Sequence, residues 1–145
     1  MWIEWPTGPF ALRLHLAEIE VASAVAGEIT LGPDTGHPCQ RWSAEHHRAG
    51  QVRLRHEATG LYLTAESDIV GAGITLRPLA DDQQWHQLWV ASYQPETTRF
   101  RLYNELSLCV LGLRSPATKS TTEGPLVLEY TSGRFDTTCT AWVAP

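Results

Sequence analysis

Hydrophobic and polar residues alternate along residues 51–65, and the rest of the chain is organised around this stretch. Val52 and Leu54 alternate with arginines, and Leu61 and Leu63 repeat the alternation after a Thr-Gly pair. A period of two is typical of a strand with one buried face. Glycine accepts the positive φ that a tight turn commonly requires. The stretch therefore predicts two strands joined by a tight turn.

The same unit recurs in weaker form at residues 12–21 and 100–110. Each copy continues into a short apolar run and then, after a loop, reaches a tryptophan. The runs are Ile29 to Leu31, Ile74 to Leu76 and Leu126 to Leu128, and the tryptophans are Trp42, Trp85 and Trp142. No segment keeps a helical period, so an all-β chain of about twelve strands is expected. Because no copy could bury its apolar face alone, we predict a single domain over residues 1–145, with copies at about 9–48, 49–95 and 96–145.

The composition narrows the class of protein. Hydrophobic residues make up 43% of the 145 residues and the net charge is −5, as in a soluble globular domain. Binding to a nucleic-acid backbone needs a concentrated basic face, and only eleven lysines and arginines are spread through the chain. Nucleic acid is therefore not expected as a partner.

The expected compartment is the cytoplasm. The chain has no apolar run near the roughly 20 residues that a membrane span needs, and its first residues lack the basic-then-apolar pattern of a signal peptide. No membrane partner is expected. Cys39, Cys109 and Cys139 are odd in number and widely spaced, which predicts free thiols.

Two copies end in a Gln-x-Trp sequence, at residues 40–42 and 83–85. Together with the three four-stranded copies, these sequences resemble the β-trefoil, and in particular the ricin-B-type lectin family, over nearly the whole chain. Residues 104–110 look like the asparagine and Cys-Leu hairpin of ricin-type repeats, and residues 52–63 resemble the first hairpin of MIR-type β-trefoil domains. The resemblance implies an all-β fold, a β-trefoil with three pseudo-equivalent four-stranded repeats, and points to carbohydrate binding.

The resemblance also implies what a working pocket contains: an aspartate after the Cys-Leu pair, an aromatic platform after the third strand and an amide before Gln-x-Trp. The carboxylate accepts hydrogen bonds from sugar hydroxyls, the ring stacks on the sugar and the amide fixes its orientation. This sequence largely departs from that pattern. The aspartate position holds Ala22, Thr64 and Leu111, the platform position Gly32, Arg77 and Glu129, and the amide position Cys39, Asp82 and Cys139.

A sugar site of different composition is expected instead. Its candidate residues in the second copy are Thr64, Glu66, Asp68, Arg77 and Asp82, and the third copy offers Tyr130. A pocket needs only a few convergent polar groups beside an apolar wall. The competing interpretation is that these are ordinary polar residues of surface loops.

Metal and catalytic chemistry have less support. The six histidines show no paired ligand spacing, so no metal is expected, and no cofactor motif is present. Ser-His-Asp and Cys-His patterns are also lacking, which makes an enzyme the less favoured class. His56 beside Glu57 is a candidate acid–base pair. The better interpretation is that His56 and Asn104 occupy matching turns and hydrogen-bond the backbone.

The sequence thus favours a non-catalytic module that binds a carbohydrate or other small-molecule ligand. Two alternatives stay open. One is a protein-interaction module that uses exposed tryptophans and the long loop at residues 114–125. The other is a small-molecule enzyme of the cyclase or isomerase type that acts by positioning its substrate in an aromatic pocket. Its candidate walls are Trp2, Trp5, Trp89 and Tyr93.

Overall fold

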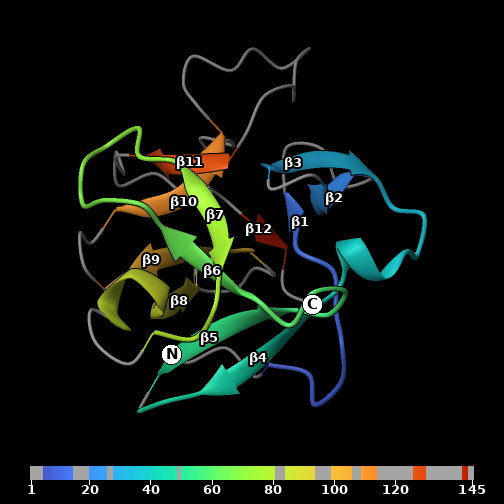
Figure 1. Cartoon of the computed structure of the whole chain (residues 1–145), viewed down its shortest axis with the longest axis horizontal. Coiled ribbons are helices and arrows are strands. Elements are labelled where there is room, and N and C mark those ends of the chain that lie inside the picture. The colour runs from blue at the N-terminus through green and yellow to red at the C-terminus, as the bar shows by residue number, and fades with distance from the viewer. Residues whose placement is uncertain are drawn as a thin grey trace.

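The computed structural model describes residues 5–14, 20–25, 28–48, 50–80, 84–93, 99–105, 109–113, 126–129 and 142–143. These residues form an all-β structure with two short 3₁₀ helices (Figure 1). The first four strands are β1 (Arg13–Leu14), β2 (Glu20–Val25), β3 (Glu28–Pro33) and β4 (Trp42–His46). The next four are β5 (Gln51–His56), β6 (Tyr62–Ala65), β7 (Ile74–Arg77) and β8 (Trp89–Tyr93). The others are β9 (Arg99–Asn104), β10 (Val110–Leu113), β11 (Leu126–Glu129) and β12 (Trp142–Val143), and the 3₁₀ helices η2 (Pro38–Gln40) and η3 (Gln84–Gln87) precede β4 and β8.

Six of the strands form a closed barrel. β1 pairs with β12, β12 with β9, β9 with β8, β8 with β5 and β5 with β4, all antiparallel. The ring closes where Phe10 and Trp42 exchange two backbone hydrogen bonds of 2.9 Å. Closure satisfies the sheet edges that would otherwise stay open in these strands. Each repeat thus contributes its first and fourth strands to the barrel.

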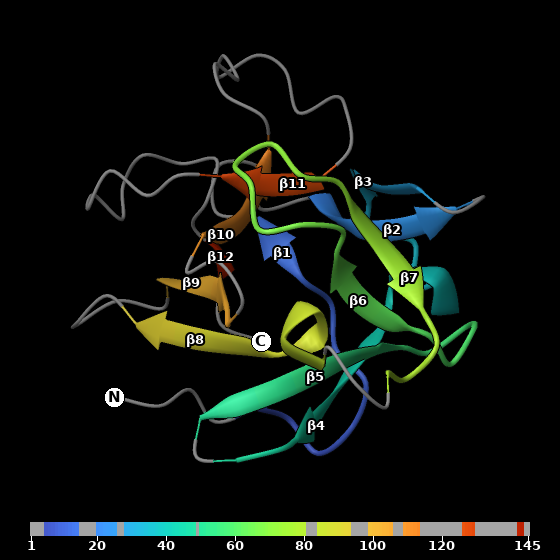
Figure 2. The same ribbon diagram turned by 60° about the vertical axis from the view of Figure 1, so that its left-hand side comes forward.

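The second and third strands of each repeat form a hairpin. The pairs are β2–β3, β6–β7 and β10–β11. The three hairpins contact one another through β3, β7 and β11. Figure 2 shows these three strands gathered at one end of the molecule, opposite β4 and β5. A six-stranded barrel covered at one end by three hairpins is the predicted β-trefoil arrangement.

One tryptophan from each repeat is buried at an equivalent place. Trp42, Trp89 and Trp142 are all 0% exposed. Each indole Nε1 donates to a carbonyl on the hairpin of its own repeat, and the acceptors are Ala22 at 3.3 Å, Leu63 at 3.1 Å and Leu111 at 3.0 Å. A buried ring whose N–H is satisfied contributes apolar burial without an unpaired donor. The three tryptophans therefore fasten the hairpins to the barrel.

The tryptophan that closes the second repeat is Trp89, so the prediction of Trp85 for this role is wrong. Trp85 lies in η3 and is 47% exposed. The closing Gln-x-Trp sequence is residues 87–89 rather than 83–85, because Gln87 is buried as Gln40 is. Gln83 lies outside the described residues.

The hairpin predicted at residues 51–65 is confirmed as β5 and β6. Val52 and Leu54 are buried, while the arginines between them are partly exposed. The turn contains Gly60 at φ 72°, where a Cβ would meet Arg55 Nη2 at 3.4 Å. A side chain there would be strained by the backbone conformation as well as crowded.

The prediction for the cysteines can be compared at Cys39, which is a free thiol as expected. Cys139 lies outside the described residues. Within the part of the chain that the structure describes, no helix has the length and apolar character to cross a bilayer.

Candidate functional site

Gln87 holds the loop after β7 against β6. Its Nε2 donates to the Pro78 carbonyl at 2.8 Å and to Thr64 Oγ1 at 3.2 Å, and its Oε1 accepts from the Ala80 backbone N–H at 3.0 Å. The Thr64 hydroxyl donates in turn to the Tyr62 carbonyl at 2.8 Å. Buried polar groups that are fully bonded make their surroundings rigid. This network fixes one wall of a cavity.

An ion pair between Glu66 and Arg77 lies beside this network. Arg77 Nε donates to Glu66 Oε1 at 2.9 Å and Arg77 Nη2 donates to Oε2 at 2.7 Å, which is a bidentate arrangement. The Thr75 hydroxyl also donates to Glu66 Oε1. The bonds from Arg77 and then Thr75 hold the pKa of the Glu66 carboxyl below its ordinary value, although partial burial acts in the opposite direction. Glu66 is therefore a carboxylate at neutral pH, and it raises the pKa of the Arg77 guanidinium.

His86 comes from η3 and lies next to the ion pair. Its Nδ1 is 2.8 Å from the Ala65 carbonyl, so this nitrogen carries the proton and donates. In the neutral ring, Nε2 is then an acceptor. His86 is partly exposed. The ring can therefore accept a hydrogen bond from a bound ligand.

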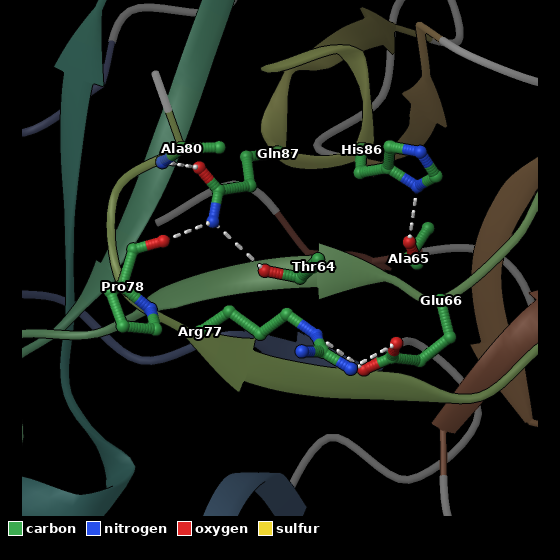
Figure 3. Close-up of a pocket in the computed structure, with 8 residues that line it drawn as sticks. All are labelled: Thr64, Ala65, Glu66, Arg77, Pro78, Ala80, His86 and Gln87. Carbon is green, nitrogen blue, oxygen red and sulfur yellow. Dashed lines mark hydrogen bonds and ion pairs between the residues drawn. The ribbon is translucent and has the colours of Figure 1, made fainter. Parts of the chain in front are cut away.

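These polar groups line a cavity of about 230 Å³ between β6, β7 and η3 (Figure 3). Ala65, Pro78 and Ala80 complete the lining. Pockets for drug-sized ligands have volumes of roughly 300–1,000 Å³. The cavity therefore suits a single small polar ring.

Three of the predicted ligand-binding residues meet in this cavity: Thr64, Glu66 and Arg77. Asp68 is exposed in the loop between β6 and β7 and is not among the lining residues. Asp82 and Tyr130 lie outside the described residues. The structure thus brings together half of the predicted set.

Sequence reasoning misses His86 and Gln87. Closing the repeat at Trp85 places Asp82 before Gln-x-Trp, whereas closing it at Trp89 places His86 there. The sequence contains a second Gln-x-Trp at residues 87–89, but its local pattern does not distinguish it from the one at 83–85.

Strand register shows that the three predicted aspartate positions are not equivalent. Thr64 pairs with Thr75, and the equivalent pairs are Ser23 with Thr30 and Gly112 with Val127. The predicted Ala22 and Leu111 therefore lie one residue earlier in register than the predicted Thr64. The predicted platform residues Gly32, Arg77 and Glu129 do occupy equivalent register positions.

The first repeat has the same glutamine network. Gln40 Nε2 donates to the Pro33 carbonyl at 2.6 Å and to Ser23 Oγ at 2.9 Å, and its Oε1 accepts from the Thr35 backbone N–H at 2.8 Å. Pro33 and Thr35 thus correspond to Pro78 and Ala80. Asp34 therefore stands where the second repeat has Leu79.

Asp34 is the centre of an ion cluster on this loop. It accepts hydrogen bonds from Arg41 Nη2 at 2.9 Å, from the Gly36 backbone N–H at 3.1 Å and from Arg13 Nη2 at 3.1 Å. The bond from Arg41, followed by those from Gly36 and Arg13, holds the pKa of Asp34 below its ordinary value. These ion pairs therefore connect the loop after β3 to β1 and to the residue that precedes β4.

His56 and Asn104 have the predicted backbone-binding role. His56 Nε2 donates to the Cys39 carbonyl at 2.8 Å, and Asn104 Nδ2 donates to the His86 carbonyl at 3.2 Å. His56 is 1% exposed and its Nδ1 is bonded to the Thr59 hydroxyl at 2.9 Å. Both ring nitrogens are thus engaged within the fold.

Two of the aromatic residues proposed as walls of an enzyme pocket belong to the core or pack against it. Trp89 is in the core, and Trp5 packs on Phe10 and Phe100 with ring centroids 5.3 Å and 5.8 Å away. The side chains of Trp2 and Tyr93 lie outside the described set. Among the described residues, no three His, Cys, Asp or Glu side chains gather as metal ligands would.

No protein-family model matches the chain, and no curated protein matches its sequence. Several solved structures match its fold. The designed threefold-symmetric protein ThreeFoil matches with a TM-score of 0.80 at 15% identity, covering 93% of this chain and 96% of that one. The Macrolepiota procera ricin B-like lectin in complex with lactose matches with a TM-score of 0.76 at 16% identity, covering 99% of this chain and 97% of that one.

The Polyporus squamosus lectin, bound to a human-type influenza-binding epitope, matches with a TM-score of 0.75 at 12% identity, covering 97% of this chain and 49% of that one. These likenesses establish the fold. The chain is a β-trefoil, as the sequence predicts.

Proposed function

We propose that this chain is a carbohydrate-binding module and that the cavity of the second repeat is its sugar site. The observation that carries the proposal is the small cavity beside the β6–β7 hairpin in which Glu66, Arg77 and His86 converge. Two structures of the same fold hold lactose and a sialylated epitope, which supports a sugar as the class of ligand.

Different residues of the cavity have different roles in this proposal. Thr64 and Gln87 are buried and committed to internal hydrogen bonds, so they position the site. Glu66, Arg77 and His86 are partly or largely exposed and bind the ligand. His86 accepts through Nε2, Glu66 accepts through its carboxylate and Arg77 donates.

Weak binding to a single sugar is expected. An arginine stands at the platform position, where an aromatic ring would add stacking energy. A dissociation constant of about 1 mM corresponds to only about 4 kcal/mol of binding free energy, which a few exposed hydrogen bonds can supply. Detection therefore needs multivalent display, which raises the apparent affinity without new contacts.

The test is a glycan array probed with the protein displayed on beads. We expect binding that is lost in Arg77→Ala. The matched control is Arg41→Ala, which removes an ion-paired arginine of the first repeat and should keep binding. Silence across the array at high valency contradicts the proposal, and equal loss in both variants contradicts the placement of the site.

The protein-interaction alternative has one supporting observation. Trp85 is 47% exposed and Leu79 is 52% exposed, and exposed large apolar side chains are favoured at protein interfaces. The loop at residues 114–125 lies outside the described residues. This alternative would be favoured by two results together. The chain would be silent on the glycan array, and it would capture a protein in a pull-down that its Trp85→Ala variant no longer captures.

A further inference from the structure

The Glu66–Arg77 ion pair keeps unused hydrogen-bonding capacity on both partners. Arg77 uses Nε and one N–H of Nη2 for Glu66, and a guanidinium has further N–H donors on Nη1 and Nη2. Glu66 Oε1 accepts from Arg77 and Thr75, whereas Oε2 accepts, among the described residues, from Arg77 alone and keeps a lone pair. A donor edge and an acceptor oxygen therefore lie side by side in the cavity lining.

The pair as a unit carries no net charge. Its carboxylate stays ionised at neutral pH because Arg77 lowers the pKa of Glu66, and its guanidinium is always charged. The side chain of Arg77 is 59% exposed and that of Glu66 is 31% exposed, so a ligand can reach both. A ligand thus meets a strong donor and a strong acceptor together.

We propose that this ion pair selects uncharged sugars that present two adjacent hydroxyls, and that it discriminates against acidic sugars. This inference rests on the proposed sugar-binding function. A hydroxyl both donates and accepts, so one hydroxyl donates to Glu66 Oε2 while its neighbour accepts from Arg77. The recognition replaces aromatic stacking with charge-assisted hydrogen bonds.

An acidic sugar is disfavoured because its carboxylate has to share Arg77 with Glu66. The free edge of the guanidinium borders the edge that Glu66 occupies, so two carboxylates would lie within a few ångströms of each other. Like charges at that distance repel even in a partly solvated site. The net charge of −5 on the chain adds repulsion of the same sign.

The experiment compares sugars of the same ring stereochemistry that differ at C6, where one has a hydroxymethyl group and the other a carboxylate. Methyl hexopyranosides of the glucose, galactose and mannose series are titrated against the methyl glycosides of the corresponding hexuronic acids, up to tens of millimolar. Binding is followed by ¹H–¹⁵N NMR through the Arg77 Nε–H and the Ala80 amide. We expect at least one neutral glycoside to bind about 10-fold more tightly than its hexuronate, a ratio typical of losing one charge-assisted contact.

Glu66→Gln tests the origin of the preference. The substitution keeps the shape of the side chain and removes the charge that repels an acid. We expect the ratio of hexose to hexuronate affinity to fall about 10-fold, because Arg77 becomes free to bind the acid. Glu57→Gln is the matched control, since Glu57 pairs with Arg55 at 3.6 Å outside the cavity, and it should leave the ratio unchanged.

The outcomes separate this inference from the proposed function. Hexuronates that bind as tightly as hexoses, or a ratio that Glu66→Gln leaves unchanged, overturn the ion-pair inference alone. No shift with either class of sugar overturns the proposed function and this inference with it. An unchanged Ala80 amide signal in unliganded Glu66→Gln shows that the Gln87 network, and therefore the cavity wall, is intact.

Discussion

The first and second repeats contain the same glutamine network but surround it differently. In the first repeat, the loop after β3 carries Asp34, which binds Arg13 and Arg41. In the second repeat, the corresponding loop after β7 carries Leu79, which is 52% exposed. In the second repeat, the charged pair lies instead on the hairpin, where Glu66 and Arg77 line the cavity.

This difference separates the part of the repeat that makes the fold from the part that makes a site. The buried glutamine and tryptophan bond mostly to backbone atoms, which any sequence supplies. The charged residues sit outside that network, so they can change position between repeats at little cost to the fold. Ligand chemistry can therefore change while the scaffold is conserved in geometry.

The largest expected effect tests whether the closing tryptophans of the first and second repeats contribute equally to stability. Trp42→Ala and Trp89→Ala should each reduce the free energy of unfolding by about 3–5 kcal/mol, because each removes a buried ring. Trp85→Ala should cost below about 1 kcal/mol, because its ring is half exposed. Urea denaturation of the three variants measures this. A cost for Trp85→Ala as large as that for Trp89→Ala would contradict the closure at residues 87–89.

The glutamines should separate stability from binding. Gln40→Ala and Gln87→Ala each leave a backbone N–H and a carbonyl without their partner, at a cost of about 1–3 kcal/mol. Both variants should therefore unfold at lower urea concentration. Gln87→Ala alone should also lose sugar binding, because the loop at residues 78–80 is released from the cavity wall. If Gln40→Ala lost binding equally, the site would not belong to the second repeat.

Acid should weaken both charged clusters. The pKa values of Asp34 and Glu66 lie below their ordinary values of 3.8 and 4.5 in the folded state. Each carboxylate therefore stabilises the fold above its unfolded pKa, and this contribution is lost as the pH falls through the folded pKa. Because both pairs are partly exposed, each effect should be below about 1 kcal/mol.

The measurement is the free energy of unfolding between pH 7 and pH 3 for Asp34→Asn, Glu66→Gln and the unmodified chain. Each variant should show a shallower decline in stability below about pH 5 than the unmodified chain. A decline of the same steepness in a variant would mean that its ion cluster contributes nothing to folding.

The smallest expected effect comes from a single substitution that gives the loop after β7 a residue of the loop after β3. Leu79→Asp places the aspartate of the first repeat in the second. In the second repeat, the residue equivalent to Arg41 is Leu88, which is 0% exposed. The new carboxylate therefore lacks an arginine partner at that position. The change in unfolding free energy should stay within about 0.5 kcal/mol. A clear gain in the urea midpoint would show that an ion cluster can form on this loop after all.

Local patterns predict the strands because burial on alternate residues is a local property. The hairpin at residues 51–65 and the buried Trp42 and Trp142 follow from such patterns. Thr64, Glu66 and Arg77 could also be grouped from the sequence, because alternate residues of two paired strands lie on the same face of a hairpin. These parts of the fold and the site can therefore be predicted from the sequence.

His86 and Gln87 were not accessible in the same way. Two Gln-x-Trp sequences lie four residues apart in the second repeat, at 83–85 and 87–89. Their local patterns are alike, and the choice between them depends on distant partners, namely Pro78 and Thr64. Long-range hydrogen bonds therefore decided which residue faces the cavity.

The seam between β1 and β12 has a consequence for how the molecule assembles. It pairs Arg13 with Val143, so the barrel cannot close until almost all of the chain is available. Contacts between residues this far apart form slowly, because a long loop has to be ordered first. A nascent chain leaving the ribosome could pair β1 with β2 early, but the other edge of β1 would stay open until β12 has been synthesised. Circular permutation through a short linker across the seam should speed refolding, by turning that distant pairing into a local one.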